Sequence, residues 1–206
     1  MTGMRHLYIV DDDDIVRASL AGLMSTQPAV DIRDFPSGDS FLEAMDGLEP
    51  GCLLLDLMMP GATGMDVMKA IARSRSRFVA IILTGQGDIP VAVQALKGGA
   101  VNFLEKPCDH RTLLMAVNNA FFELQHELQE RTRREVARAK LELLSGRELD
   151  VLRGLMDGLP NKLIAHHLEI SPRTVEIYRA NVMEKLGVRS LSEVLRITFA
   201  AGMDAA

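Results

Sequence analysis

Short apolar runs alternate with segments of helical periodicity over the first 120 residues. The apolar runs lie at residues 7–10, 30–35, 52–56, 79–84 and 102–105. Helical patterns follow them at residues 15–25, 37–46, 64–73, 89–97 and from about 109 onward. Strand then helix, five times over, predicts a parallel sheet with helices on both faces, the doubly wound α/β (flavodoxin-like) class. The run at 30–35 alternates polar and apolar positions and predicts an edge strand, because central strands of such sheets are apolar throughout.

The fifth helical pattern continues without proline or glycine to about residue 140. Its first part carries apolar residues at helical spacing, namely Val117, Phe121, Leu124 and Leu128. The remainder is charged on nearly every face. We therefore expect the first part to pack on the sheet and residues 123–140 to form a helical linker. A coiled coil between two copies of the chain is the alternative, because the same four residues form a heptad-like seam.

Residues 141–206 carry no strand pattern and predict four helices. Two helix starts have the sequence of a capping box, a serine followed three residues later by glutamate: Ser145 with Glu148, and Ser190 with Glu193. Between them, Ser171 predicts the N-cap of a helix with Pro172 at its first position and Gly187 past its end. A short helix, a tight turn and this longer helix predict an all-α helix-turn-helix domain.

Composition and charge narrow the class of protein. The chain has 206 residues, 48% of them hydrophobic, which allows a substantial core. No apolar run approaches the roughly 20 residues of a membrane helix, so we expect a cytoplasmic protein without a membrane partner. Acidic residues outnumber basic ones by 15 to 10 in residues 1–120 but only by 9 to 8 in residues 141–206. Nucleic-acid binding by the second part must therefore depend on local basic patches. Cys52 and Cys108 lack the spacing of a metal site, and we expect each to be a small core residue.

Polar side chains with related chemistry follow four of the predicted strands. They are Asp11 and Asp12 after the first, Asp56 at the end of the third, Thr84 at the end of the fourth and Lys106 after the fifth. Ligands of doubly wound sheets bind at the carboxyl ends of the strands, so we expect these side chains to converge. Three carboxylates repel one another unless a cation joins them, and an all-oxygen set suits Mg²⁺ or another divalent cation. Asp56 could then act as a nucleophile that becomes an aspartyl phosphate, with Thr84 and Lys106 binding phosphoryl oxygens.

The segments VDDD, LLLDLMMPGATG, IILTGQGD and FLEKP, in this order, resemble the receiver domains of bacterial two-component response regulators. The resemblance spans residues 1–122. It implies that Asp56 is the phosphoacceptor and receives its phosphoryl group from a sensor histidine kinase. It also implies that Asp12, Asp56 and the backbone carbonyl of Met58 bind the metal, and that Asp11 acts through water.

The same resemblance implies a switch pair, Thr84 and Phe103, in which phosphate draws the hydroxyl inward and the aromatic ring follows. Phe103 lacks the hydroxyl of receivers that carry tyrosine there. Lys106 is expected to precede a cis proline, Pro107. An aspartate-based phosphatase usually has a second acid two positions after its nucleophile, whereas this chain has Met58 there. We therefore expect a switch that modifies itself, and not an enzyme that turns over an external substrate.

Residues 141–206 resemble the LuxR-type helix-turn-helix, and the segments LPNK and SPRTVEIYRANVMEKL resemble FixJ-type regulators in particular. Val175, Leu186 and either Tyr178 or Val182 would face the core. Seven residues would lie on the DNA-facing side: Lys162, Arg173 and Thr174 toward the phosphate backbone, Glu176, Ile177 and Ala180 toward base edges, and Arg179 on the same face.

These features together predict a phosphorylation-controlled transcriptional regulator. Its partners would be the sensor kinase, promoter DNA and RNA polymerase, and the phosphorylated form would dimerise. Two other functions stay open, a receiver that serves as a phosphate sink without DNA binding and an aspartate-based phosphatase. For the second domain, a helical protein-interaction module is the alternative to DNA binding.

Overall fold

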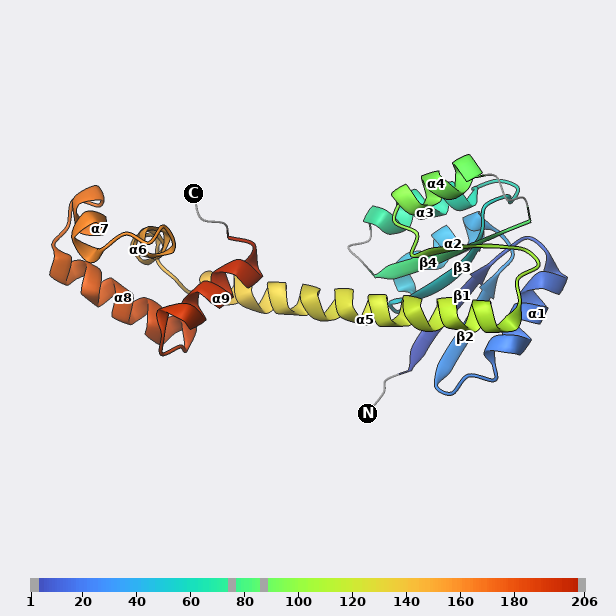
Figure 1. Ribbon diagram of the computed structural model, residues 1–206, viewed down its shortest axis with the longest axis horizontal. Coiled ribbons are helices and arrows are strands. Elements are labelled where there is room, and N and C mark those ends of the chain that lie inside the picture. Colours follow the sequence, from blue (N-terminus) through green and yellow to red (C-terminus); the bar gives the residue numbers. More distant parts are fainter. Residues whose placement is uncertain (1–3, 74–76, 86–88, 204–206) are drawn as a thin grey trace. The chain divides into compact units, whose positions relative to one another are not determined.

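The computed structural model describes residues 4–73, 77–85 and 89–203, which belong to two compact units, Met1–Leu128 and Gln129–Ala206. The first unit (Figure 1) contains β1 (Arg5–Val10), α1 (Asp14–Met24), β2 (Val30–Phe35), α2 (Gly38–Ala44), the 3-10 turn η1 (Met45–Gly47), β3 (Gly51–Asp56), α3 (Gly64–Arg73), β4 (Phe78–Thr84), α4 (Ile89–Lys97), β5 (Asn102–Glu105) and the first part of α5 (His110–Leu141). The second contains the end of α5, then α6 (Gly146–Met156), α7 (Asn161–His167), α8 (Pro172–Leu186) and α9 (Leu191–Ala201).

The sheet of the first unit has five parallel strands in the order β2-β1-β3-β4-β5. Each predicted strand is present within one or two residues of its expected bounds, and the doubly wound fold is confirmed. β2 lies at the edge, as its alternating sequence predicts, whereas every residue of β3 and β4 is buried. The order of the strands reverses between β1 and β3, and this is where such sheets bind ligands.

Helices cover both faces of the sheet, and the strands supply a core to each face. Successive side chains of a strand point to opposite faces. On β1, Tyr8 and Val10 pack in the cluster that includes Phe41 of α2, and Leu7 and Ile9 pack in the cluster beside α1 and α5. Figure 1 shows α3 and α4 on the opposite side of the sheet from α5.

The apolar seam of α5 packs on the sheet. Val117, Phe121 and Leu124 are buried in the cluster that α5 shares with α1, and Leu128 packs against its border. The prediction that the first part of this helix covers the sheet is confirmed. Within one chain, Val117, Phe121 and Leu124 belong to the core of the first unit, and a coiled coil between two copies of the chain stays a prediction.

α8 begins and ends as the sequence predicts. The hydroxyl of Ser171 accepts a hydrogen bond from the backbone N–H of Thr174 at 3.1 Å, and Pro172 occupies the first turn. Gly187 ends the helix in the left-handed region with φ of +67°, where a side chain would be strained. The predicted core stripe is confirmed, since Val175, Val182 and Leu186 are buried and Tyr178 is half-buried.

Of the two capping boxes predicted for residues 141–206, one is complete and the other is not. The Ser145 hydroxyl accepts from the Glu148 N–H, and the Glu148 carboxylate accepts from the Ser145 N–H at 2.7 Å. Ser190 likewise accepts from the Glu193 N–H, but the Glu193 carboxylate accepts from the N–H of Arg189 at 2.9 Å. The predicted box at α9 is thus wrong by one residue, because the chain before the cap turns the Arg189 N–H toward this carboxylate.

Within the described ranges, no helix is both long enough and apolar enough to cross a membrane. Buried polar side-chain atoms of the same ranges all have hydrogen-bond partners. Cys52 is fully buried and Cys108 is half-buried, both as free thiols.

Glu148 links α6 to α8 by charge. Its side chain is 4% exposed, and its Oε2 atom also accepts from Lys185 Nζ at 2.7 Å. This ion pair with Lys185, together with the Ser145 N–H, lowers the pKa of Glu148 to about 2. A carboxyl whose pKa falls on folding stabilises the fold above its unfolded pKa, and this stabilisation is lost as the pH falls toward 2.

We expect Glu148→Gln to lower the free energy of unfolding at pH 7 by about 1 to 2 kcal/mol, because a charged hydrogen bond becomes a neutral one. The difference from wild type should shrink between pH 4.5 and 2 in denaturant titrations followed by circular dichroism. Glu142→Gln, at an exposed glutamate just before α6, is the matched control and should leave the profile unchanged. A pH-independent difference would contradict the assigned role of the Glu148 charge.

Candidate functional site

Three aspartates meet at the carboxyl edge of the sheet. Asp11 and Asp12 follow β1, and Asp56 is the last residue of β3, the strand beside it. One carboxylate oxygen from each lies within 4.8 Å of the other two. Asp11 and Asp56 are 2% and 9% exposed, whereas Asp12 is open to solvent. The predicted convergence is confirmed, with two buried acids behind one accessible acid.

Lys106 reaches the same carboxylates from the end of β5. Its Nζ atom donates to Asp11 Oδ2 at 2.5 Å and to Asp56 Oδ2 at 3.0 Å. Burial alone would lower the pKa of Lys106, but the hydrogen bonds with Asp11 and Asp56 outweigh it, and the pKa is raised. Lys106 is therefore held as a cation between the two buried acids.

The chemistry of this donor set fits a hard divalent cation. Two unit charges about 4 Å apart interact by roughly 4 kcal/mol at an effective dielectric constant near 20, so close carboxylates need positive charge nearby. One Lys106 ammonium cannot neutralise Asp11, Asp12 and Asp56 together. The three aspartates offer oxygen atoms only, and exposed Asp12 leaves room for water, as Mg²⁺ prefers. The N–H of Met58 donates to Asp56 Oδ1 at 3.2 Å, which fixes the start of the loop after β3.

The remaining predicted receiver residues lie on the neighbouring strands. Thr84, 3% exposed, ends β4, and its carbonyl accepts from the Lys106 N–H at 2.8 Å. Phe103 lies opposite Ile82 in the β4–β5 pair and is half-buried against the core on the α2–α4 side. The peptide bond between Lys106 and Pro107 is cis, as the resemblance implies.

Two residues that support the loop after Asp56 were missed by sequence reasoning. A Cβ atom on Gly64 would lie 2.2 Å from the Asp56 carbonyl oxygen, so only glycine fits where α3 begins. Asp39 of α2 accepts from the N–H of Ala62 at 3.0 Å and holds the middle of the loop. The second glycine of the segment PGATG was a signal for Gly64, whereas no local pattern pointed to Asp39.

In the second unit, α7 and α8 form the predicted helix-turn-helix pair. The side chains predicted to face DNA are exposed at Lys162, Arg173, Glu176, Ile177 and Ala180 and half-buried at Thr174 and Arg179. Ile177 is 54% exposed, one of several large apolar side chains that are open to solvent.

Arg179 has a partner within its own chain. Its Nη1 atom donates to Asn161 Oδ1, at the first residue of α7, over 2.8 Å. This hydrogen bond joins the two helices of the pair, so a DNA contact by Arg179 would have to share or replace it. Sequence reasoning placed both residues in FixJ-like segments but could not pair them.

Comparisons with known proteins identify both units. Residues 7–118 match the response regulator receiver domain, and residues 142–198 match the luxR family of bacterial regulatory proteins. The transcriptional regulatory protein FixJ of Bradyrhizobium diazoefficiens is 41% identical over 203 residues, which cover 98% of each chain. The chain belongs to the FixJ-like response regulators. Receiver and DNA-binding domain together make it a phosphorylation-controlled transcriptional regulator, a class of protein distinct from catalytic enzymes.

Other relatives of this FixJ-like regulator have the same organisation. The response regulator protein TmoT of Ectopseudomonas mendocina is 36% identical over 93% of this chain and 87% of its own. Among solved structures, the response regulator StyR has a TM-score of 0.79 at 33% identity and covers 96% of this chain and 99% of its own. Full-length FixJ from B. japonicum has a TM-score of 0.59 at 40% identity and covers 98% of this chain and 99% of its own.

We expect Gly64→Ala to lower the free energy of unfolding by about 2 kcal/mol, because the new methyl group must displace the backbone of Asp56. Denaturant titration of the full chain measures this change. Gly22→Ala in α1 is the matched control, since a Cβ there meets nothing within 4 Å and should stabilise the helix by about 1 kcal/mol. Equal effects of the two substitutions would contradict the close packing at Asp56.

Proposed function

We propose that Asp56 accepts a phosphoryl group from a sensor histidine kinase, and that this controls binding of α8 to promoter DNA. The cluster of Asp11, Asp12 and Asp56 around Lys106, at the strand ends of a receiver fold, carries this proposal. Because promoter DNA is the target, the regulator would work in the cytoplasm.

The transfer needs a carboxylate nucleophile and compensation of charge. An oxygen of Asp56 attacks the phosphorus of the kinase phosphohistidine, the P–N bond breaks and the imidazole leaves with the bonding electron pair. Lys106 already contacts Asp56 and can bind one phosphoryl oxygen, and the hydroxyl of Thr84 can donate to another. An aspartyl phosphate on Asp56 is the product.

Mg²⁺ or another divalent cation would be held by Asp12, Asp56 and the backbone carbonyl of Met58, with Asp11 acting through water. When bound, it neutralises charge that develops on the phosphoryl oxygens. The carboxylate oxygens of Asp11, Asp12 and Asp56 lie within 4.8 Å of one another, which supports one cation shared by this cluster.

Phosphorylation must favour one of two states of the receiver to have an effect. Thr84 and Phe103 form the proposed switch pair, in which the Thr84 hydroxyl moves to the phosphate and the Phe103 ring follows into the space. Phe103 is half-buried and so has both core and solvent beside it. The altered surface would lie around α4 and β5.

The output would pass from the receiver, residues 1–122, through a helical linker, residues 123–140, to the DNA-binding domain, residues 141–206. Dimerisation of the phosphorylated form would place two copies of α8 on one promoter and allow contact with RNA polymerase. Lys162, Arg173 and Thr174 would hold the phosphate backbone, while Glu176, Ile177 and Ala180 would face base edges. Arg179 would join them only by sharing its bond with Asn161.

Two alternatives give different results in solution. A receiver that serves only as a phosphate sink would bind DNA weakly and without dependence on salt. An aspartate-based phosphatase would show steady multiple turnover of a phosphoester. The residue two positions after Asp56 is Met58, which cannot supply a second acid, so a single modification of Asp56 is favoured over turnover.

We expect wild-type protein incubated with acetyl phosphate and Mg²⁺ to gain the mass of one phosphoryl group, and Asp56→Asn to gain none. Intact-mass spectrometry measures both. Asp46→Asn, at an exposed aspartate in η1, is the matched control and should be labelled like wild type. Equal labelling of wild type and Asp56→Asn would reject Asp56 as the acceptor.

We expect Lys162→Ala to weaken promoter binding for all sequences and to reduce the slope of log affinity against log salt by about 1, because one phosphate contact is lost. Footprinting of a promoter library with and without phosphorylation first defines the sites. Arg189→Ala is the control. Arg189 is exposed and follows the C-terminal end of α8, so its removal should leave the slope of log affinity against log salt unchanged. If neither the phosphorylated nor the unphosphorylated wild-type protein protects any promoter site in the footprint, the proposed DNA binding is rejected.

A further inference from the structure

Arg17 is the one buried arginine among the described residues and lies directly behind the acidic cluster. It belongs to the first turn and a half of α1, and its side chain is 9% exposed. A buried guanidinium is retained only where it is paired, because removing its charge from water is costly. Its partners therefore indicate what it holds in place.

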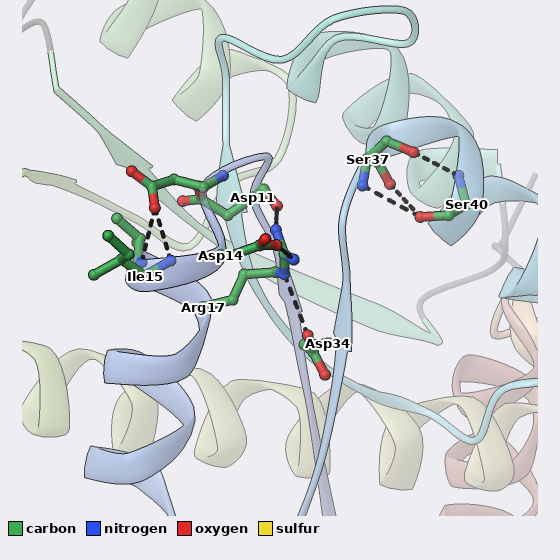
Figure 2. Close-up of polar contacts among 9 residues, drawn as sticks. Asp11, Asp14, Ile15, Arg17, Asp34, Ser37 and Ser40 are labelled. Atoms are coloured by element: carbon green, nitrogen blue, oxygen red, sulfur yellow. Dashed lines mark hydrogen bonds and ion pairs between the residues drawn. The ribbon is translucent and has the colours of Figure 1, made fainter.

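The guanidinium binds three separate parts of the chain (Figure 2). Nη1 donates to the backbone carbonyl of Asp11 at 2.7 Å, at the end of β1. Nε donates to Asp34 Oδ2 on β2 at 3.2 Å, and Nη2 donates to the Asp14 carboxylate. The carboxylate of Asp11 is held independently, by its bonds to the Asp13 N–H at 3.0 Å and to Lys106. Asp11 is thus fixed through both its backbone and its side chain.

Arg17 also helps to divide the run of four aspartates. The Asp13 carboxylate accepts from the N–H groups of Ile15 and Val16 and caps α1, so it is occupied by the helix. The Asp14 carboxylate is paired with Arg17. Only Asp11 and Asp12 of the four join Asp56 in the cluster. Asp13 and Asp14, the next two residues in the sequence, bind the start of α1 and Arg17 instead.

We propose that Arg17 is a positioning residue for the cation site: by holding the Asp11 carbonyl and the Asp14 carboxylate, it places Asp11 and Asp12 for binding a divalent cation. This inference rests on the proposed function of the acidic cluster. Groups that orient metal ligands typically change metal affinity by 10- to 100-fold when they are removed.

Electrostatics and positioning predict opposite results at this residue. Arg17 brings a positive charge near the cation, so electrostatics alone would make Arg17→Gln bind the cation more tightly and leave Arg17→Lys unchanged. Positioning requires the planar fork of the guanidinium, which lysine cannot replace with its single ammonium. Under our proposal both variants lose affinity.

The test is calorimetric titration of Mg²⁺ into the full-length chain at constant ionic strength. We expect the dissociation constant to rise about tenfold in both Arg17→Lys and Arg17→Gln. Arg73→Gln, at an exposed arginine at the end of α3, controls for net charge and should match wild type. Denaturant titration of each variant reports stability separately, because a merely structural role would lower stability and leave the dissociation constant unchanged.

A second pair of variants decides the question if Arg17→Gln does not fold. Asp34→Asn removes one anchor of the guanidinium, and Asp31→Asn removes the same charge from the same strand at similar exposure, 58% against 61%. Weaker Mg²⁺ binding by Asp34→Asn than by Asp31→Asn supports the proposal. Unchanged or tighter binding in the folded Arg17 variants overturns it while the proposed function stands. Absence of Mg²⁺ binding by wild type overturns both.

Discussion

Repulsion among carboxylates gathered at one edge of a sheet is the constraint on which the rest of the receiver depends. Asp11, Asp12 and Asp56 bring oxygen atoms within 4.8 Å of one another, and two of these residues are buried. Such a cluster persists only if the fold holds it and positive charge compensates it. Lys106 supplies charge from the end of β5, and parallel strands are what bring the ends of β1, β3 and β5 to the same edge. The same unbalanced charge makes the site suited to a cation.

Other contacts of the first unit can be understood as supports for that cluster. Gly64 allows α3 to begin directly against the Asp56 carbonyl, and Asp39 holds the loop between them from α2. Arg17 performs a similar task on the other side, where it joins β1, β2 and α1. Helices α1, α2 and α3 thus do more than bury the faces of the sheet, because each also contacts one of the segments that carry or follow the acidic residues.

The second unit uses charge in a different way. Glu148 is a buried carboxylate whose partners are a helix N-terminus and Lys185, and its lowered pKa reflects a purely structural pairing. Asn161 and Arg179 join α7 to α8 through one hydrogen bond. These contacts join α8 to α6 and α7, while Glu176 and Ile177 stay exposed to solvent. The apolar seam of α5, by contrast, belongs to the core of the first unit, and this leaves its charged continuation to reach the second.

The sequence by itself determined the elements, their order and the acids at the strand ends. Periodicity, capping residues and glycine positions are local signals, and they correctly placed β1 to β5, the cap at Ser171 and the end of α8 at Gly187. Beyond the acids at the strand ends, only the tertiary structure decided which side chains meet. Arg17 with Asp34, Asn161 with Arg179, and Glu193 with the Arg189 N–H all depend on the relative positions of elements or on the path of the chain before a helix. A long polar side chain can reach several partners, and no periodic sequence pattern indicates which one it binds. The packing of the elements decides the pairing.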